Sequence, residues 1–359
     1  MKDLKSLEQM QVRPGGVSLG PYSLASHPLF APQAAAVRPE GVAVSPDGAR
    51  LYVTSSASGT VSVLDTTTHK VIATVAAGKS PRGMALSPDG ARLYLANLLS
   101  DTVTVLDTAT LAPVATVPVG AEPFGVAAHP DGTRVYVASS LSGVVSVIDA
   151  ASNIVTATVP GTRGSLSVAV HPNGSRVYVT NSSTATLAVI DATTNTLMAT
   201  ILMGVDQDGF PNRPYGVAVS PHGARVYVAN FLSGSVSVLD SATHAVFAVI
   251  PMGVNLSGAP HRPYAVAVHP GGTRVYVANL LSATVTVLDA ATRTIVATVP
   301  VGSNPRGVAV SPNGAYVFVP NAGSDTVSVI DTATNSVVAT VAVEAGPEAL
   351  TQRRLAVVG

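Results

Sequence analysis

Three charged residues occupy equivalent places in a repeating sequence and could together handle an anion. Glu40, Arg82 and Arg306 each follow a proline directly, in the phrases PEGVAV, PRGMAL and PRGVAV. A guanidinium binds a carboxylate or phosphate through paired hydrogen bonds, and a carboxylate can act as a general base or acid. The three residues therefore suggest an anion-binding site that holds one acid/base group.

The same position recurs along the chain at spacings of 42, 42, 42, 49, 49 and 42 residues. In chain order the seven residues are Glu40, Arg82, Phe124, Leu166, Tyr215, Tyr264 and Arg306. If the repeats close into a ring, Arg306 and Arg82 flank Glu40, and the other four residues form an apolar arc. A mostly apolar pocket with a few converging polar groups is the usual form of a small-molecule site.

The position allows two interpretations. In the first, Glu40 is a general acid or base, Tyr215, Tyr264 or His261 is its partner in proton transfer, and Arg82 and Arg306 hold an oxyanion. Opposite charge on both sides would make Glu40 a weak base unless a ligand occupies the arginines. In the second, the charged residues are a structural ion-pair cluster that closes the ring, and the tyrosines are ordinary packing.

The repeat itself predicts the elements that position these residues. An eleven-residue phrase, SPDGARLYVTS at Ser45 to Ser55, returns with starts at Ser87, His129, His171, Ser220, His269 and Ser311. Each copy holds four short apolar runs separated by turn residues, with no helical pattern. Four strands per copy of about 40 to 50 residues predict an all-β fold, a seven-bladed β-propeller with four antiparallel strands in each blade.

Two further residues of the repeat have structural interpretations. An aspartate ends the third run of every copy, where its carboxylate can accept backbone N–H bonds in a hairpin. Six copies also carry an arginine at the start of the second run, for which we expect blade-surface or blade-to-blade ion pairs. The aspartates are Asp65, Asp107, Asp149, Asp191, Asp240, Asp289 and Asp331, and the arginines are Arg50, Arg92, Arg134, Arg176, Arg225 and Arg274.

The repeat resembles the YVTN-type β-propeller repeat, whose signature stands unaltered at Tyr178 to Asn181. The resemblance covers residues 39 to 343, with an N-terminal arm at 1–38 and a tail at 344–359 that could add an outer strand. It implies relatives as different as surface-layer modules, periplasmic binding proteins, heavy chains of redox enzymes and lyases. The fold that it implies therefore does not choose the function.

Composition excludes several classes of protein. The chain of 359 residues has zero net charge, 11% charged residues and no cysteine. It therefore has no thiolate site and no overall basic character for nucleic acid or a membrane surface. No apolar run reaches the length of a membrane span. We expect a soluble monomer without a cofactor, which is cytoplasmic, or exported if a signal segment has been removed.

Two insertions and three apolar pairs modify the same end of the propeller. The 49-residue copies gain seven residues before their first run, at Met203 to Val219 and Met252 to Val268, which bring Arg213 and Arg262 to the mouth. Apolar pairs that begin at Leu98, Phe231 and Leu280 replace small polar residues in loops between the second and third runs. Exposed apolar groups of this kind mark a ligand or partner site, or else fold over blade edges.

Metal sites have little support. Asp206 and Asp208 resemble the opening of a calcium loop, but Val217 stands where the closing acid should be. His129, His171 and His269 lie in turns at the opposite face, so only His261 is near the mouth. A three-histidine copper or zinc site is not expected.

Three functions remain open. The first is a protein that binds a partly apolar anionic small molecule, with or without activity as a non-redox lyase, isomerase or cyclase. The second is a non-catalytic interaction or surface scaffold. The third and weakest is the binding of single-stranded nucleic acid, with bases stacked on the tyrosines and arginines.

Overall fold

The computed structural model describes residues 37–205, 209, 211–254, 258 and 260–343. The chain divides into two compact units, Met1–Ala35 and Ala36–Gly359, and the described residues all belong to the second. The expected N-terminal arm, except residues 37 and 38, the expected C-terminal tail, and the calcium-loop residues Asp206 and Asp208 lie outside the described residues.

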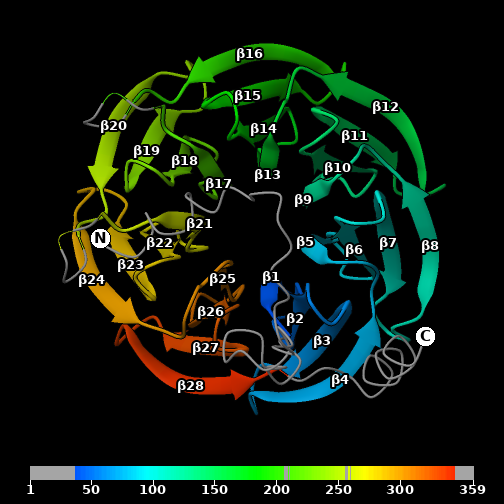
Figure 1. Cartoon of the computed structure of the whole chain (residues 1–359), viewed down its shortest axis with the longest axis horizontal. Coiled ribbons are helices and arrows are strands. Elements are labelled where there is room, and N and C mark those ends of the chain that lie inside the picture. Colours follow the sequence, from blue (N-terminus) through cyan, green and yellow to red (C-terminus); the bar gives the residue numbers. More distant parts are fainter. Residues whose placement is uncertain (1–36, 206–208, 210, 255–257, 259, 344–359) are drawn as a thin grey trace, which may run out of the picture. The chain divides into compact units, whose positions relative to one another are not determined.

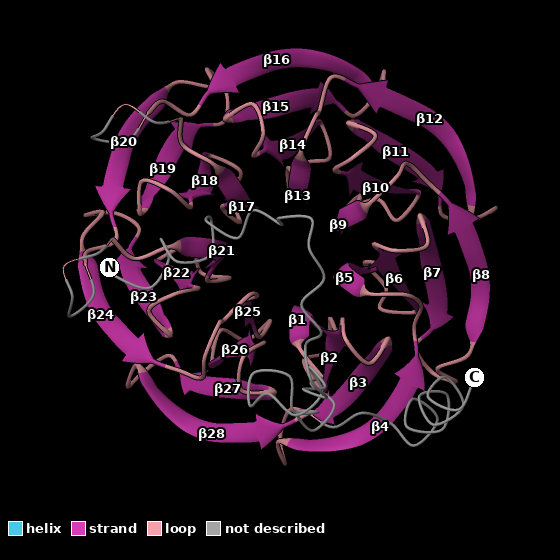
Figure 2. Cartoon of the chain, viewed as in Figure 1, coloured by secondary structure: helices cyan, strands magenta, loops and turns pink. Residues whose placement is uncertain are grey.

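The described chain folds into seven antiparallel sheets of four strands, and each sheet consists of four strands that are consecutive in the sequence. Figure 1 shows the first strand of each sheet nearest the common axis and the fourth at the rim. Figure 2 shows that strands and loops make up the ring, without helices in the described part. The predicted all-β, seven-bladed propeller is confirmed.

The strand positions repeat from blade to blade. The first strands are β1 (Pro39–Val44), β5 (Pro81–Leu86), β9 (Pro123–Ala128), β13 (Ser165–Val170), β17 (Pro214–Val219), β21 (Pro263–Val268) and β25 (Ala309–Val310). The second strands are β2 (Arg50–Ser55), β6 (Arg92–Asn97), β10 (Arg134–Ser139), β14 (Arg176–Asn181), β18 (Arg225–Asn230), β22 (Arg274–Asn279) and β26 (Tyr316–Asn321). The third strands are β3 (Thr60–Asp65), β7 (Thr102–Asp107), β11 (Val144–Asp149), β15 (Thr186–Asp191), β19 (Ser235–Asp240), β23 (Thr284–Asp289) and β27 (Thr326–Asp331). The fourth strands are β4 (Lys70–Ala76), β8 (Pro113–Pro118), β12 (Ile154–Pro160), β16 (Thr196–Leu202), β20 (Val246–Pro251), β24 (Ile295–Pro300) and β28 (Ser336–Ala342).

The hydrophobic core lies between blades. One cluster joins Tyr136 and Val147 of the third blade to Val177, Val179 and Ile190 of the fourth, and all five side chains are fully buried. The same arrangement occurs at each of the other six junctions. Second and third strands are covered on both faces, which accounts for their continuous valine-rich sequences. The outer strands are partly exposed and alternate in burial.

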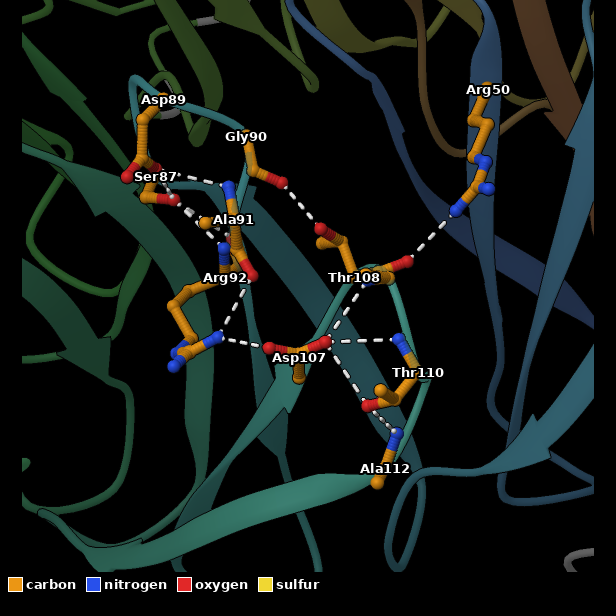
Figure 3. A network of polar contacts seen from close by, with 11 residues as sticks. Arg50, Ser87, Asp89, Gly90, Ala91, Arg92, Asp107, Thr108, Thr110 and Ala112 are labelled. Carbon is orange, nitrogen blue, oxygen red and sulfur yellow. Dashed lines mark hydrogen bonds and ion pairs between the residues drawn. The ribbon is translucent and has the colours of Figure 1, made fainter.

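The aspartate that ends each third strand holds a hairpin, as predicted. Asp107 accepts hydrogen bonds from the backbone N–H groups of Ala109 and Thr110 at 3.1 and 2.9 Å and from the Thr110 hydroxyl at 3.0 Å. Figure 3 shows this hairpin beside the Ser87–Arg92 turn, where Asp89 accepts the Ala91 N–H. These residues therefore satisfy the backbone of tight turns, which is the structural role that the sequence predicted.

The prediction of ion pairs for the repeated arginines is only partly right. Arg92 and Arg225 pair with the aspartate of their own blade. Arg50 instead donates to the Thr108 carbonyl of the next blade at 2.8 Å, which Figure 3 also shows. Arg134 and Arg176 likewise donate to backbone carbonyls of the following blade, and Arg134 also pairs with Asp131 of its own blade at 3.8 Å. The facing hairpin presents a backbone carbonyl to the junction, and this carbonyl accepts the arginine.

Three turn histidines also tie neighbouring blades. The Nε2 atoms of His129 and His171 lie 2.8 and 3.0 Å from the carbonyl oxygens of Gly174 and Gly223, so this nitrogen is the donor in both rings. His269 makes the equivalent bond to Gly314 at 3.2 Å. All three serve the junctions between blades, at positions where other blades carry serine.

The ring closes between the last and the first blade through the same kind of contact that joins other blades. Asp325 accepts hydrogen bonds from the backbone N–H groups of Val37 and Arg38 at 3.1 and 2.8 Å. Asp101 does the same for Glu122 of the next blade, at 2.9 Å. Because every described sheet is built from one continuous segment, closure requires no strand exchange among the described residues.

Near the axis, the first strands approach each other too closely for most side chains. A Cβ atom added to Gly125 would lie 2.7 Å from the carbonyl oxygen of Leu166 on the next blade, and one added to Gly307 would lie 2.6 Å from that of Glu40. Two other carbonyls of the same ring are held by threonines, because Thr54 Oγ1 donates to the Arg82 carbonyl at 2.7 Å and Thr180 Oγ1 to the Tyr215 carbonyl at 2.5 Å. Glycine at this position therefore sets the distance between neighbouring first strands.

This spacing predicts the effect of a single methyl group. Gly125→Ala should lower the free energy of unfolding by about 1–3 kcal/mol, because the backbone of the next blade must move away. Ser167→Ala at the same position of the following blade is the matched control and should change stability by less than about 0.5 kcal/mol. Denaturant unfolding measures both changes. Equal stability of Gly125→Ala and the parent chain would contradict the close approach.

The aspartate turns predict the dependence of stability on acid. The backbone N–H and then the hydroxyl of Thr110 hold the pKa of Asp107 below its ordinary value. At Asp131, burial acts to raise the pKa, but hydrogen bonds from Thr133 outweigh it and lower the pKa to about 2. A carboxylate whose pKa is lowered by folding stabilises the protein above its unfolded pKa of about 3.9, and this contribution is lost as pH falls towards the folded pKa.

We therefore expect the thermal midpoint to change little between about pH 7 and 5 and to fall between about pH 4 and 2. Asp107→Asn keeps an acceptor oxygen but cannot ionise, so it should show a shallower decline. A midpoint that stays constant to pH 2 would contradict this role of the turns. Scanning calorimetry across the range measures it.

Candidate functional site

The first strands enclose a cavity of about 200 Å³ on the propeller axis. Three consecutive residues of each first-strand segment line it, so the wall has three layers. The first layer is Glu40, Arg82, Phe124, Leu166, Tyr215, Tyr264 and Arg306, which we call the mouth ring. The second is glycine except for Ser167 and Ala265, and the third is valine except for Met84. The cavity thus has a small-residue waist and an apolar floor.

The charged arc of the mouth ring is a triplet centred on Glu40. Its carboxylate Oε2 is paired with Nη1 of Arg82 and lies 3.5 Å from Nη1 of Arg306. Its other oxygen, Oε1, accepts a hydrogen bond from Ser56 Oγ at 2.7 Å. The Glu40 side chain is 6% exposed, against 19% for Arg82 and 32% for Arg306. A buried carboxylate is therefore fully occupied, whereas both guanidiniums reach the cavity.

The triplet carries an excess of positive charge. Two arginines and one glutamate leave a formal charge of +1 at the mouth. The Nε atoms of Arg82 and Arg306 are both buried and have no hydrogen-bond partner within the described structure. Leaving such a donor unsatisfied costs about 1–3 kcal/mol. The arc therefore offers both charge and hydrogen-bond donors to an incoming anion.

The two tyrosines of the opposite arc form a series of aromatic contacts with Phe231. The ring centroids of Tyr215 and Tyr264 are 5.0 Å apart, and those of Tyr215 and Phe231 are 4.9 Å apart. The guanidinium of Arg306 lies 5.7 Å from the Tyr264 centroid, which joins the two arcs. Arg82 makes the same contact with Phe124 at 5.7 Å. Both arginines of the triplet are thus bordered by aromatic faces.

Tyr264 is a hydrogen-bond donor in this setting. Burial, partly offset by the nearby Arg306, raises the pKa of its hydroxyl to about 12. The neutral phenol therefore persists through the physiological range and can donate a hydrogen bond. The same pKa makes the residue a poor partner for proton transfer with Glu40 near neutral pH.

The structure places the other predicted site residues outside the cavity wall. The Nδ1 atom of His261 is hydrogen-bonded to Ser282, and burial lowers the pKa of the imidazole. Arg262 donates to the backbone carbonyls of Phe231 and Leu232, so it fixes a loop. Arg213 is exposed. The proton-transfer role expected for His261 thus finds no contact with Glu40.

The apolar loop residues separate into two groups. Leu98 and Leu280 are half-buried, and their backbone N–H groups bond to Ser80 and Arg262 at 3.1 and 2.8 Å. The leucine that follows each of them is exposed, at 69% for Leu99 and 63% for Leu281. Leu141, which sequence reasoning missed because a serine precedes it, is 68% exposed. Three loops between second and third strands therefore each expose a leucine. We call Leu99, Leu141 and Leu281 the apolar fringe.

Sequence reasoning also missed Ser56 and Met84. Ser56 occupies the loop position at which other blades carry Leu98, Phe231 or Leu280, and this equivalence could have indicated its contact with Glu40. Pro320 is a third missed feature. It has no N–H to donate to β25, which is shortened to two residues beside Arg306.

Comparisons with known proteins agree with this architecture. A family model described as lactonase, seven-bladed β-propeller, matches residues 217–348, and a model described as cytochrome D1 haem domain matches residues 33–125. No curated protein matches the sequence. Hydrazine synthase from Kuenenia stuttgartiensis is a similar solved structure, with a TM-score of 0.75 and 24% identity over 83% of this chain and 96% of that one. Together these likenesses show a seven-bladed propeller.

The cavity does not fit a haem. Haem iron is held by histidine, cysteine, methionine or tyrosine. Of these, the described lining offers Met84, Tyr215 and Tyr264, and the pKa of about 12 at Tyr264 disfavours the phenolate that would bind iron. A cavity of about 200 Å³ is also smaller than ordinary pockets for drug-sized ligands.

The described residues contain no cluster of His, Cys, Asp and Glu arranged as metal ligands. In the same part of the chain, no helix has the length and hydropathy of a membrane span.

The triplet predicts a stability effect at Glu40. Glu40→Gln should lower the free energy of unfolding by about 2 kcal/mol, because two guanidiniums then face each other without their shared counterion. This is less than the 3–5 kcal/mol of a fully buried pair, since both arginines are partly screened by solvent. Arg92→Gln breaks the exposed Arg92–Asp107 pair as a control and should cost less than about 1 kcal/mol. Unchanged stability of Glu40→Gln would contradict the triplet.

Proposed function

We propose that this propeller binds a small, partly apolar anion at the mouth of its central channel. The observation that carries the proposal is the Arg82–Glu40–Arg306 triplet, which has a net positive charge and two partly exposed guanidiniums on the cavity wall. A ligand carboxylate or phosphate would bind these guanidiniums through charge-assisted hydrogen bonds. The apolar arc beside the triplet would cover the rest of the ligand.

The geometry supports binding more directly than catalysis. Both oxygens of Glu40 already accept hydrogen bonds or ion pairs, from Ser56 on one side and the arginines on the other. A general base needs a free oxygen near its substrate. A ligand anion that drew the arginines away would free Oε2, and Glu40 would then be available for a non-redox elimination, isomerisation or cyclisation. Catalysis is thus a second candidate function that requires the binding step.

A scaffold function is favoured by one separate observation. Leu99, Leu141 and Leu281 project apolar side chains that are at least 63% exposed from three loops. This fringe would suit a protein partner, as the resemblance to YVTN-type surface modules suggests. Substitution of Leu99 and Leu281 by Asp would abolish such an interaction and would leave anion binding at the triplet unchanged.

A thermal-shift screen of small carboxylates and phosphates tests the proposed function. A ligand at 100 times its Kd stabilises the protein by about 2.7 kcal/mol, which raises the midpoint by a few degrees. Arg306→Gln should weaken binding about tenfold or more, whereas Arg92→Gln, on an exposed turn, should have no effect.

The variant Glu40→Gln separates the two candidates for this site. If the site only binds, removal of the negative charge should keep or increase anion affinity. If Glu40 also transfers a proton, the variant should bind the ligand but convert none of it. Failure of every anion to shift the midpoint, or equal shifts in Arg306→Gln and the parent chain, would overturn the proposal.

A further inference from the structure

The aromatic residues of this protein are concentrated at the channel mouth more than the fold requires. The repeat places one aromatic ring in each blade on the second strand, where it is buried in the core. These seven are Tyr52, Tyr94, Tyr136, Tyr178, Tyr227, Tyr276 and Phe318. The sequence has no tryptophan and only nine other Phe or Tyr residues. Four of the nine, Phe124, Tyr215, Phe231 and Tyr264, lie in or against the mouth ring.

These mouth aromatics are departures from an otherwise uniform repeat. The equivalent positions of other blades carry Glu40, Arg82, Leu166 and Arg306 at the mouth ring, so the blade geometry itself accepts charged or aliphatic side chains there. The third layer of the cavity, by contrast, stays aliphatic in every blade. An apolar floor alone would suit any aliphatic chain. The added rings require a different explanation from packing of the blade.

The rings and the arginines form one connected surface around the cavity. Contacts run from Arg306 to Tyr264, from Tyr264 to Tyr215, and from Tyr215 to Phe231. On the other side of Glu40, Arg82 lies over Phe124. An anionic group on the triplet therefore places the adjoining part of its molecule beside Phe124, Tyr215 and Tyr264, all of which line the cavity.

From this arrangement we propose that the ligand is a small aromatic carboxylate. Its carboxylate binds Arg82 and Arg306, and its ring packs on Tyr215 and Tyr264, which we call the tyrosine arc. The proposal rests on the proposed function and deepens it. Contact between aromatic rings strengthens binding by about twofold to twelvefold beyond the burial of their area, which an aliphatic ring of similar size does not gain. The cavity of about 200 Å³ limits the body of the ligand to roughly one ring. The neutral Tyr264 hydroxyl adds a donor for a polar substituent or for the carboxylate itself.

Titration calorimetry with three carboxylates of the same charge tests the class of ligand. The probes are benzoate, cyclohexanecarboxylate and hexanoate, each titrated into the parent protein. We expect benzoate to bind about tenfold more tightly than cyclohexanecarboxylate, which corresponds to the upper end of the aromatic gain. Hexanoate, whose chain could extend to the valine floor, should also bind more weakly than benzoate.

Two variants assign the preference to the tyrosine arc. Tyr215→Leu keeps an apolar side chain but removes the ring, so it should abolish the preference for benzoate and leave the affinity for cyclohexanecarboxylate nearly unchanged. Tyr264→Phe keeps the ring and removes the hydroxyl, so it should retain the preference. Circular dichroism and the thermal midpoint establish that both variants fold. If Tyr215→Leu is destabilised, Tyr264→Leu, which removes the other ring of the pair, tests the assignment in its place and should also reduce the preference.

The outcomes separate this inference from the proposed function. If cyclohexanecarboxylate or hexanoate binds as tightly as benzoate, and Arg306→Gln weakens all of them, the anion site stands and its aromatic specificity is wrong. If none of the three binds and other anions do, the aromatic specificity is wrong as well. If no anion binds at all, both proposals fail. A benzoate preference that survives in Tyr215→Leu would overturn the assignment to this arc.

Discussion

The close approach of the first strands at the axis is the constraint on which the site depends. Gly125 and Gly307 lie against the carbonyls of the next blade, where a Cβ atom would not fit without movement. The residue just before each of these glycines is held at the mouth ring, and the residue just after it forms the apolar floor. Hydrogen bonds from Thr54 and Thr180 to the neighbouring mouth-ring carbonyls of Arg82 and Tyr215 fix this spacing. The ring is therefore a rigid frame with seven exchangeable side chains.

A frame of this kind can acquire a binding site without any change in its architecture. The cores between blades and the aspartate hairpins recur from blade to blade and carry the stability. The mouth ring varies freely because it contributes little to those contacts. Charged residues at three adjacent copies form the triplet, and Tyr215 and Tyr264 at two other adjacent copies are in contact. The residues of the mouth ring can therefore differ between blades with little effect on the stability of the fold, except at Glu40.

Much of the fold could be predicted from the sequence, because a period of 42 or 49 residues with four strands per copy leaves few alternatives. The mouth ring could be predicted for the same reason, since equivalent positions of a closed ring must meet. The hydrogen bonds made by individual side chains could not be predicted. Arg50 and Arg134 donate to carbonyls of the next blade, which depends on how two blades face each other and not on either sequence alone. The bond from Ser56 to Glu40 and the bond from His261 to Ser282 likewise depend on loop conformations that the repeat pattern does not specify.

The most direct test of the account is a crystal structure of the protein soaked with 4-bromobenzoate, with anomalous diffraction recorded at the bromine edge. The account predicts a bromine peak inside the mouth ring, among Phe124, Leu166 and Tyr215, and carboxylate density on the guanidiniums of Arg82 and Arg306. A bromine peak elsewhere on the propeller would contradict it, as would a mouth ring in which Arg82 and Arg306 remain on Glu40 alone at saturating ligand.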